Sequence, residues 1–240
     1  MQTLKGQTAI ITGAGKGLGK AMALAFAVEG INLGLIARTE SDLQKVSEEA
    51  KKINPEITIS YAIADVADYT QVQNAVAKIA GELKTIDILI NNAGVLKVGG
   101  LLEMPVAEWE QVIKVNVLGA YYVLHEVLPY ILKQEKGDIV NISSTAGLKG
   151  NAKLSAYGAS KAAFTNLSEA VMQEVRKSNI RVTTVSPSTI ATDMTMDANF
   201  TDGNKEKVLQ PEDLAYLVIN NLKLPPRAFV KELGLWSTNP

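Results

Sequence analysis

The sequence predicts an α/β fold in which a parallel sheet of about seven strands lies between two layers of helices. Short apolar runs alternate with segments of helical length along the whole chain, which is typical of a sheet built from strand–helix–strand units. The runs lack a polar residue at every second position, as expected of strands buried on both faces of a parallel sheet. No internal repeat, low-complexity tract or linker divides the chain, so we expect residues 1–240 to form a single domain.

Each expected element follows from its local pattern. The strands are the short apolar runs at residues 7–12, 31–37, 57–64, 86–90, 138–142, 180–186 and 228–235. The helices are residues 20–29, alanine-rich and closed by Gly30; 40–53, charged and amphipathic; 67–84; about 105–134, interrupted near Gly119 and Pro129; 155–177; and 211–222, which begins with a proline.

Composition excludes several classes of function. Hydrophobic residues make up 47% of the chain, which is enough for a full core, and the net charge of −1 argues against nucleic acid as the main partner. The chain has no cysteine, so disulfides, thiolate nucleophiles and zinc–thiolate sites are excluded. The N-terminus runs directly into a strand without a signal-peptide pattern, and the apolar run at 21–28 is far too short to span a membrane. We therefore expect a soluble, cytoplasmic protein with no membrane partner.

A glycine-rich loop, GAGKGLG at residues 13–19, separates the first strand from the first helix. Glycines allow a tight turn and a close approach of the backbone to a pyrophosphate, and the helix N-terminus adds free N–H groups. A flexible loop without a ligand is the alternative, but the position of the loop favours a dinucleotide site. The chain is therefore predicted to be a single-domain Rossmann fold with a doubly wound sheet.

The residues after the second strand indicate which dinucleotide is bound. An enzyme that uses NAD is expected to carry a carboxylate there for the ribose 2′-hydroxyl, whereas this chain has Ala37, Arg38 and Thr39, with no carboxylate before Glu40. The guanidinium of Arg38 suits a 2′-phosphate, and Lys16 in the glycine loop adds a second cation. We predict NADP(H) over NAD(H); the alternative is that both are solvated surface cations.

Tyr157 and Lys161 form the most distinctive pair in the chain. Residues four apart share one face of a helix, so the ammonium can favour the ionised phenol and bring its pKa towards neutral. Seven tyrosines are present and only Tyr157 has a lysine at this spacing, so chance remains an alternative for the pair by itself. Ser143 and Ser144 follow an apolar run just upstream and add a candidate hydrogen-bond donor.

Together these motifs resemble the short-chain dehydrogenase/reductase family over nearly the whole chain. The matching positions are Thr12, Gly13, Gly17 and Gly19 of the glycine motif, Asp65, Asn91 to Gly94, Asn116, Ser144, and the Tyr157–Lys161 pair. The combined details are most similar to the branch of 3-oxoacyl-[acyl-carrier-protein] reductases.

The resemblance implies a role for each matching residue. Tyr157 would be the general acid in reduction, with Lys161 lowering its pKa and binding the nicotinamide ribose, and Ser144 would donate a hydrogen bond to the substrate oxygen. Asn116 would hold a water that connects Lys161 to solvent. The expected cofactor contacts are Gly13, Gly15, Lys16, Gly17, Leu18, Gly19, Arg38, Asp65, Val66, Asn92, Ala93, Gly94, Tyr157, Lys161, Pro187, Ile190 and Thr192. No metal site is expected, because the only histidine, His125, has no cysteine or carboxylate cluster around it.

The sequence leaves several classes of substrate possible. The leading hypothesis is NADPH-dependent reduction of a 3-oxoacyl thioester, with acyl carrier protein as a candidate partner and Lys149 and Lys153 as candidate contacts for an anionic pantetheine arm. Departures from that branch are Ser188 after Pro187, a short segment at 194–210, the ending KELGLWSTNP, and Glu135 and Ser178 where carrier-docking arginines would fall. The alternatives are a reductase of small ketones, sugars or alcohols and, less favoured, a non-catalytic NADP(H)-binding regulator or a methyltransferase.

Self-association is also expected from the resemblance, as a homodimer or homotetramer. The helix at 155–175 carries small and apolar residues that could pack on a second subunit: Ala156, Ala159, Ala163, Ala170 and Val171. The alternative is that these residues belong to the core of the chain itself. Trp109 and Trp236 are expected to be packing or interface residues.

Overall fold

The computed structural model describes residues 2–238 and contains one sheet of seven parallel strands in the order β3-β2-β1-β4-β5-β6-β7. The strands are β1 (Thr8–Thr12), β2 (Asn32–Ala37), β3 (Ile59–Ile63), β4 (Ile88–Asn91), β5 (Gly137–Ile142), β6 (Ile180–Pro187) and β7 (Glu232–Leu235). The predicted α/β class, the parallel sheet and its number of strands are confirmed. The chain reverses its direction of progress along the sheet between β1 and β4, which is where ligands bind in open α/β sheets.

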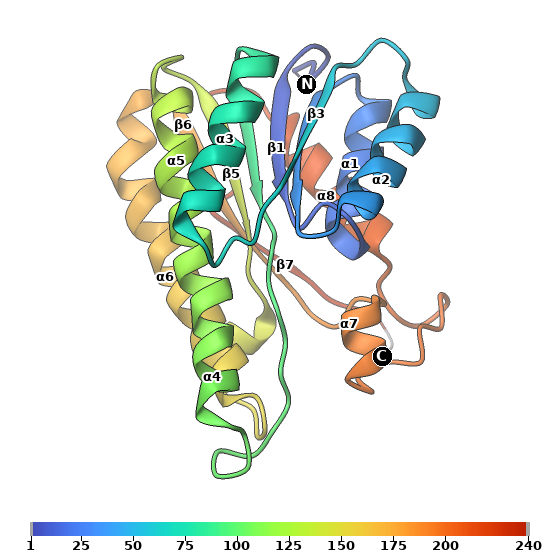
Figure 1. Cartoon of the computed structure of the whole chain (residues 1–240), viewed down its shortest axis with the longest axis vertical. Coiled ribbons are helices and arrows are strands. Elements are labelled where there is room, and N and C mark those ends of the chain that lie inside the picture. The colour runs from blue at the N-terminus through green and yellow to red at the C-terminus, as the bar shows by residue number, and fades with distance from the viewer. Residues whose placement is uncertain (1, 239–240) are drawn as a thin grey trace.

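Helices cover both faces of this sheet (Figure 1). On one face lie α1 (Gly17–Val28), α2 (Glu40–Ile53) and α8 (Pro211–Leu222). On the other lie α3 (Tyr69–Leu83), α5 (Ala120–Leu132) and α6 (Ser155–Val175). Each layer closes its own hydrophobic core: Phe26 of α1 is fully buried on one side of the sheet and Phe164 of α6 on the other.

The long helical region differs from the expectation. It runs without a break through α4 (Val106–Ile113), a π-helical stretch η1 (Lys114–Gly119) and α5. Pro129 lies inside α5, so the interruption predicted there is wrong. A proline removes only one backbone hydrogen bond, and the packing of α5 on α3 and the sheet holds the helix across it. Near Gly119 the chain widens into the π-helix and does not end.

Other differences concern the ends of elements. The last strand is shorter than expected, because residues 228–231 lie outside it. A short helix, α7 (Asp193–Asp197), follows β6 and was not predicted. A 3-10 turn at Arg176–Ser178 ends α6, and Asn179 after it takes a left-handed conformation with φ +57°.

A buried ion pair joins the amino-terminal ends of β5 and β6. The Arg181 guanidinium donates from Nε to Asp138 Oδ1 (2.6 Å) and from Nη2 to Asp138 Oδ2 (2.9 Å). The same guanidinium donates to the carbonyls of Leu222, Leu224 and Ala228, which lie at and beyond the end of α8. This one side chain therefore fixes the C-terminal part of the chain to the sheet.

The continuous helix Val106–Leu132 is long and apolar enough to cross a membrane, by length and composition alone. Core helices of soluble proteins have the same composition, and this helix packs on α3, α6 and the sheet. The expected absence of a membrane partner stays a prediction.

Candidate active site

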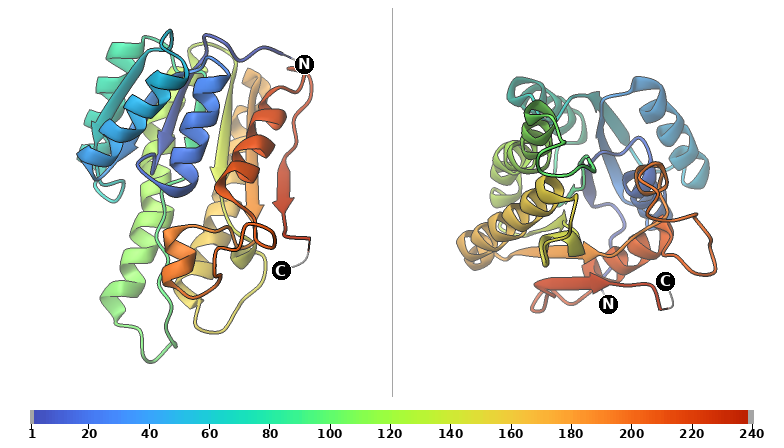
Figure 2. Two further views of the ribbon diagram at one scale, coloured as in Figure 1. Left: turned by 90° about the vertical axis from the view of Figure 1, so that its right-hand side faces the viewer. Right: turned by 90° about the horizontal axis from the view of Figure 1, so that it is seen from below.

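A cavity of about 470 Å³ opens at the carboxyl ends of the parallel strands. Its walls come from the loops that follow β1, β2, β3, β4, β5 and β6, together with the first turns of α6 and the helix α7. Seen from below, these segments surround the end of the sheet (Figure 2). Nearly all residues predicted for the site line this one cavity; Gly19 and Asn116 lie behind its wall.

Thr12 at the end of β1 ties the glycine loop to the end of β4. The backbone N–H groups of Asn92 and Ala93 each donate to Thr12 Oγ1 at 3.0 Å, and Asn92 Nδ2 donates to the Thr12 carbonyl at 2.9 Å. Gly13 takes φ +66°, and a Cβ there would lie 3.0 Å from Asn92 Nδ2 and 3.1 Å from Ala93 Cα. Only glycine therefore fits where these two loops meet.

Gly19 does not line the cavity, so its predicted cofactor contact stays a prediction. It lies in the first turns of α1 and is buried, and a Cβ there would lie 2.2 Å from the Gly13 carbonyl oxygen. It allows the helix to pack closely against the loop, so the cavity is shaped by Gly19 without being lined by it.

The charged end of the cavity lies beyond β2 and β3. Lys16, Arg38, Asp42 and Asp65 line it, and Asp65 Oδ1 accepts a hydrogen bond from the Ala67 N–H at 2.9 Å. Lys16 Nζ also lies 3.9 Å from Asp193 Oδ2 of α7, in an exposed ion pair. Asp42 was not predicted; it lies three residues after Thr39, the residue that precedes α2, and a Cβ on Gly15 would lie 3.0 Å from its Cβ.

The two serines at the end of β5 have separate environments. Ser143 Oγ is buried, with Thr165 Oγ1 at 2.8 Å and a hydrogen bond to the Lys161 carbonyl at 3.2 Å. Ser144 is half-buried beside Tyr157, and its Oγ accepts from the Ala146 N–H at 3.1 Å. The Ser144 hydroxyl can therefore still donate into the cavity, and its predicted bond to the substrate oxygen stays a prediction.

Lys161 is buried on the inner face of α6. Its Nζ donates to the Ile142 carbonyl at 2.8 Å and lies 5.8 Å from the centre of the Tyr157 ring and 5.6 Å from that of Phe164. Burial lowers the pKa of Lys161 from 10.5 to about 8. The lysine therefore keeps its charge at neutral pH in a place where water does not stabilise that charge.

The pKa of Tyr157 differs from the expectation. Burial raises it above its usual value of 10.0, and the hydrogen bond with Ser144 opposes that rise only in part. Spacing alone suggested that Lys161 would lower it, but the ammonium lies over the ring and bonds to the Ile142 carbonyl. The chain by itself therefore does not produce a lowered phenol pKa.

Asn116 is buried in the π-helical stretch η1. Its Nδ2 donates to the Val95 carbonyl (2.9 Å) and to Ser160 Oγ (3.0 Å), and its Oδ1 accepts from the Val95 N–H (2.8 Å). Both amide protons are thus used by protein partners. The side chain holds the loop after β4 in place, and the water that was expected of it stays a prediction.

Several lining residues escaped the sequence analysis. They are Val95, Leu96, Thr145, Asn151, Leu154, Ser188, Thr189, Met194 and Phe200, all in loops or helix ends around Ser144 and Tyr157. No spacing rule identifies them, because they are brought together by loops from different strands. Lys149 lines a neighbouring hollow of about 240 Å³, and Lys153 contributes its backbone carbonyl to Gly99 (2.9 Å).

The α6 residues that were expected to contact a second subunit differ in their exposure. Ala156 and Val171 are buried in the core of the chain, as the alternative interpretation held, whereas Ala159, Ala163 and Ala170 are exposed.

The family is shown by comparison with known proteins. A model of the short chain dehydrogenase family matches residues 7–203. The chain belongs to the short-chain dehydrogenase/reductase family.

Two relatives in sequence are informative. An uncharacterized oxidoreductase of Staphylococcus saprophyticus is 34% identical over 233 residues, covering 97% of this chain and 98% of its own. A 3-oxoacyl-[acyl-carrier-protein] reductase of Thermotoga maritima is 36% identical over 196 residues, covering 80% of this chain and 77% of its own. The chain is therefore related to oxidoreductases over its whole length.

Solved structures of the family carry both nicotinamide cofactors. An alcohol dehydrogenase of Thermococcus sibiricus complexed with 5-hydroxy-NADP has a TM-score of 0.87 and 26% identity, covering 98% of this chain and 97% of its own. A short chain dehydrogenase of Mycobacterium paratuberculosis bound to NAD has a TM-score of 0.88 and 25% identity, with coverage of 98% and 97%.

Proposed function

We propose that this short-chain dehydrogenase/reductase is an NADPH-dependent carbonyl reductase whose substrate is a 3-oxoacyl thioester. One observation carries the proposal of catalysis: Ser144, Tyr157 and Lys161 line the same cavity as the glycine loop after β1. A binding protein without catalytic function would not require a phenol, a hydroxyl and a buried ammonium to meet beside its cofactor site.

The cavity suits a nicotinamide dinucleotide. Gly13 and Gly94 both line it, and neither carries a side chain that would keep a ligand away from the backbone of these loops. The proposed contacts are the lining residues Gly13, Gly15, Lys16, Gly17, Leu18, Arg38, Asp65, Val66, Asn92, Ala93, Gly94, Pro187, Ile190 and Thr192. Bound NADPH would supply the hydride.

The side chains of the chain supply the proton and the orientation. Tyr157 donates its proton to the substrate oxygen as hydride is added to the carbonyl carbon, and Ser144 donates a second hydrogen bond to that oxygen. Lys161 binds ribose hydroxyls and stabilises the phenolate left on Tyr157. Because burial raises the pKa of Tyr157 in the chain alone, we propose that its proton transfer depends on the positive charges of Lys161 and of the oxidised nicotinamide.

The preference for NADPH is supported by the two cations at the charged end of the cavity. Arg38 and Lys16 line it, against the carboxylates of Asp42 and Asp65. A guanidinium matches the planar, charged oxygens of a 2′-phosphate. Comparing kcat/KM for NADPH and NADH tests this, and a preference for NADH would contradict it.

The 3-oxoacyl thioester is supported by the identity with the Thermotoga maritima reductase. Reduction of small ketones, sugars or alcohols is the second candidate, and the short segment at 194–210 together with the similarity to an alcohol dehydrogenase favours it. Oxidation of NADPH with acetoacetyl thioester, on coenzyme A or on acyl carrier protein, beside small ketones and sugars, separates the two. Turnover of the small carbonyls alone would reject the thioester.

We further propose that the protein is soluble, cytoplasmic and a homodimer or homotetramer, with Ala159, Ala163 and Ala170 on the exposed face of α6 packing against another subunit. Measuring the mass in solution for the wild type and for Ala163→Glu tests it. A monomeric wild type would contradict the proposal.

A further inference from the structure

The two halves of the cavity differ in chemistry. The half formed by the loops after β1, β2 and β3 carries the charged residues described above. The half around Ser144 and Tyr157 has four large apolar residues in its wall: Leu96, Leu154, Met194 and Phe200. α7, which carries Met194, lies across the end of the sheet from α4 and the start of α6 (Figure 1).

We infer that the substrate carries an uncharged, apolar body next to its reacting carbonyl, and that Met194 and Phe200 bind it. This inference rests on the proposed function, because it takes Ser144 and Tyr157 to mark the position of the carbonyl. The chemical class is a 3-oxoacyl chain or another ketone with a hydrocarbon substituent. A polyol, a sugar or a carboxylated ketone does not belong to it.

Two of the apolar side chains in this wall are partly exposed to water. Met194 is 40% exposed and Phe200 42% exposed, although both line a cavity. Large apolar side chains that face water inside a concave site are typical of a surface that an apolar ligand covers. Leu96 and Leu154, in the same wall, are half-buried.

This half of the cavity carries few charged groups. Among the described residues, the only charged groups in this half are Lys161 and Asp193. Lys161 is buried and bonded to the Ile142 carbonyl, and Asp193 lies 3.9 Å from Lys16. Within residues 2–238, no further cation lines this half to bind a carboxylate or phosphate of the substrate.

Apart from these two charged groups, the polar groups of this half are neutral. Besides Ser143, Ser144 and Tyr157, they are the hydroxyls of Thr145, Ser188, Thr189 and Thr195 and the amide of Asn151. Asn151 Nδ2 already donates to the Lys149 carbonyl at 3.1 Å. Such a set suits one or two further neutral oxygens, such as a thioester carbonyl, and not the row of hydroxyls of a polyol.

A series of substrates tests the inference. We would measure kcat/KM for 3-oxobutanoyl, 3-oxohexanoyl and 3-oxooctanoyl coenzyme A, and for 2-butanone, 2-hexanone and 2-octanone, at saturating NADPH. Burial of each additional methylene is expected to raise kcat/KM by up to about fourfold. Values that do not change with chain length, or higher values for sugars and keto acids, would overturn the inference.

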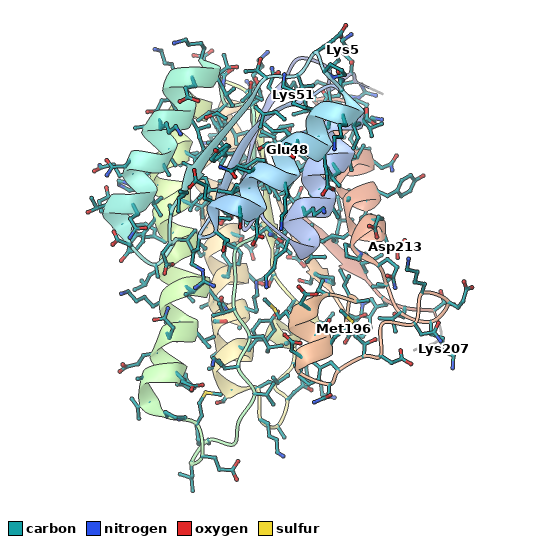
Figure 3. All side chains as sticks on the ribbon, turned by 45° about the vertical axis from the view of Figure 1, so that its right-hand side comes forward. Lys5, Glu48, Lys51, Met196, Lys207 and Asp213 are labelled. Atoms are coloured by element: carbon teal, nitrogen blue, oxygen red, sulfur yellow. The ribbon has the colours of Figure 1, made fainter. Side chains whose placement is uncertain are left out.

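Matched variants identify the residues. Phe200→Ser and Met194→Ser should flatten the dependence on chain length while leaving the Kd for NADPH unchanged. Met196→Ser is the control, because Met196 lies on the same short helix (Figure 3). It is 40% exposed and is not among the residues that line the cavity. If Met196→Ser flattens the series as much as Phe200→Ser does, the assignment to Phe200 and Met194 is wrong.

The test separates this inference from the proposed function. Rising values for the ketones with no turnover of thioesters would reject the thioester and retain the apolar site. If neither series is turned over, the proposed function fails. Inhibitor binding then decides the inference: the affinity of 2-butanol, 2-hexanol and 2-octanol for the NADPH-loaded protein must rise with chain length, and a constant affinity overturns it.

Discussion

Replacing Lys161 by methionine should abolish turnover and yet make the fold more stable. Lys161 is 4% exposed, and burial lowers its pKa from 10.5 to about 8. At pH 7 it is protonated in both the folded and the unfolded chain, so the folded chain holds a charge that burial disfavours. Methionine has a similar unbranched shape and carries no charge.

The expected change in the free energy of unfolding follows from the lowered pKa of Lys161. The difference between 10.5 and about 8 corresponds to roughly 3 kcal/mol of unfavourable free energy for the charged form in the folded chain. The variant also leaves the Ile142 carbonyl without its hydrogen bond from Nζ, which costs about 1 kcal/mol. We expect a net stabilisation of about 2 kcal/mol at pH 7, equivalent to a rise of roughly 4–8 °C in Tm for a chain of this size.

The way in which the stability difference between Lys161→Met and the wild type changes with pH provides a second check. Between the folded pKa of about 8 and the unfolded 10.5, the unfolded chain binds more protons, so the stability of the wild type rises with pH in that window. The advantage of Lys161→Met should therefore shrink as the pH goes from 7 to 9.5.

Urea unfolding without cofactor, at one protein concentration and at both pH values, measures the stability of Lys161→Met. The control is Lys149→Met, an exposed loop lysine, for which a change within about 0.5 kcal/mol is expected. A variant less stable than the wild type at pH 7, or a difference that does not depend on pH, would refute the reasoning.

Three further changes test other parts of the molecule. Tyr157→Phe should reduce kcat by at least about a hundredfold while retaining NADPH binding by fluorescence titration; substantial residual turnover would reject Tyr157 as the acid. Arg181→Met should destabilise the fold by about 3–5 kcal/mol, because it leaves the Asp138 carboxylate buried without its partner, and unfolding at pH 7 that matches the wild type would contradict this. Arg38→Leu should lower kcat/KM for NADPH by about tenfold or more and leave NADH nearly unchanged, and equal losses with both cofactors would show that Arg38 does not bind the 2′-phosphate.

The parts of the fold that the sequence predicted are those set by local pattern. Buried parallel strands appear as apolar runs because both of their faces are covered, and the helices between them show their own spacing. The interruption predicted at Pro129 was wrong because the effect of a proline on its own backbone can be judged from the sequence, but the packing around it cannot. The continuity of α5 depends on that packing. The helix α7 was missed because five residues are too few to show a periodicity.

In the site, too, the features within one segment were predicted and those that depend on tertiary packing were not. The glycine loop and the Tyr157–Lys161 pair lie within single segments, so their spacing was readable. Met194 and Phe200 line the same cavity as Leu96 and Leu154 only because loops after different strands converge at one end of the sheet. The pKa of Tyr157 could not be read from spacing either, since it depends on burial, which no local pattern reports.

Burial at this site bears on how Tyr157 could give up a proton under the proposed function. The same environment raises the pKa of Tyr157 and lowers that of Lys161, so in the chain alone both groups are driven towards their neutral forms. A phenolate and an ammonium side by side would relieve both shifts, because each would stabilise the charge of the other. In the proposed mechanism, oxidised nicotinamide would add a further positive charge near Tyr157. In the proposed mechanism, the unfavourable free energy of burying the Lys161 ammonium would thus be offset once Tyr157 is ionised beside it.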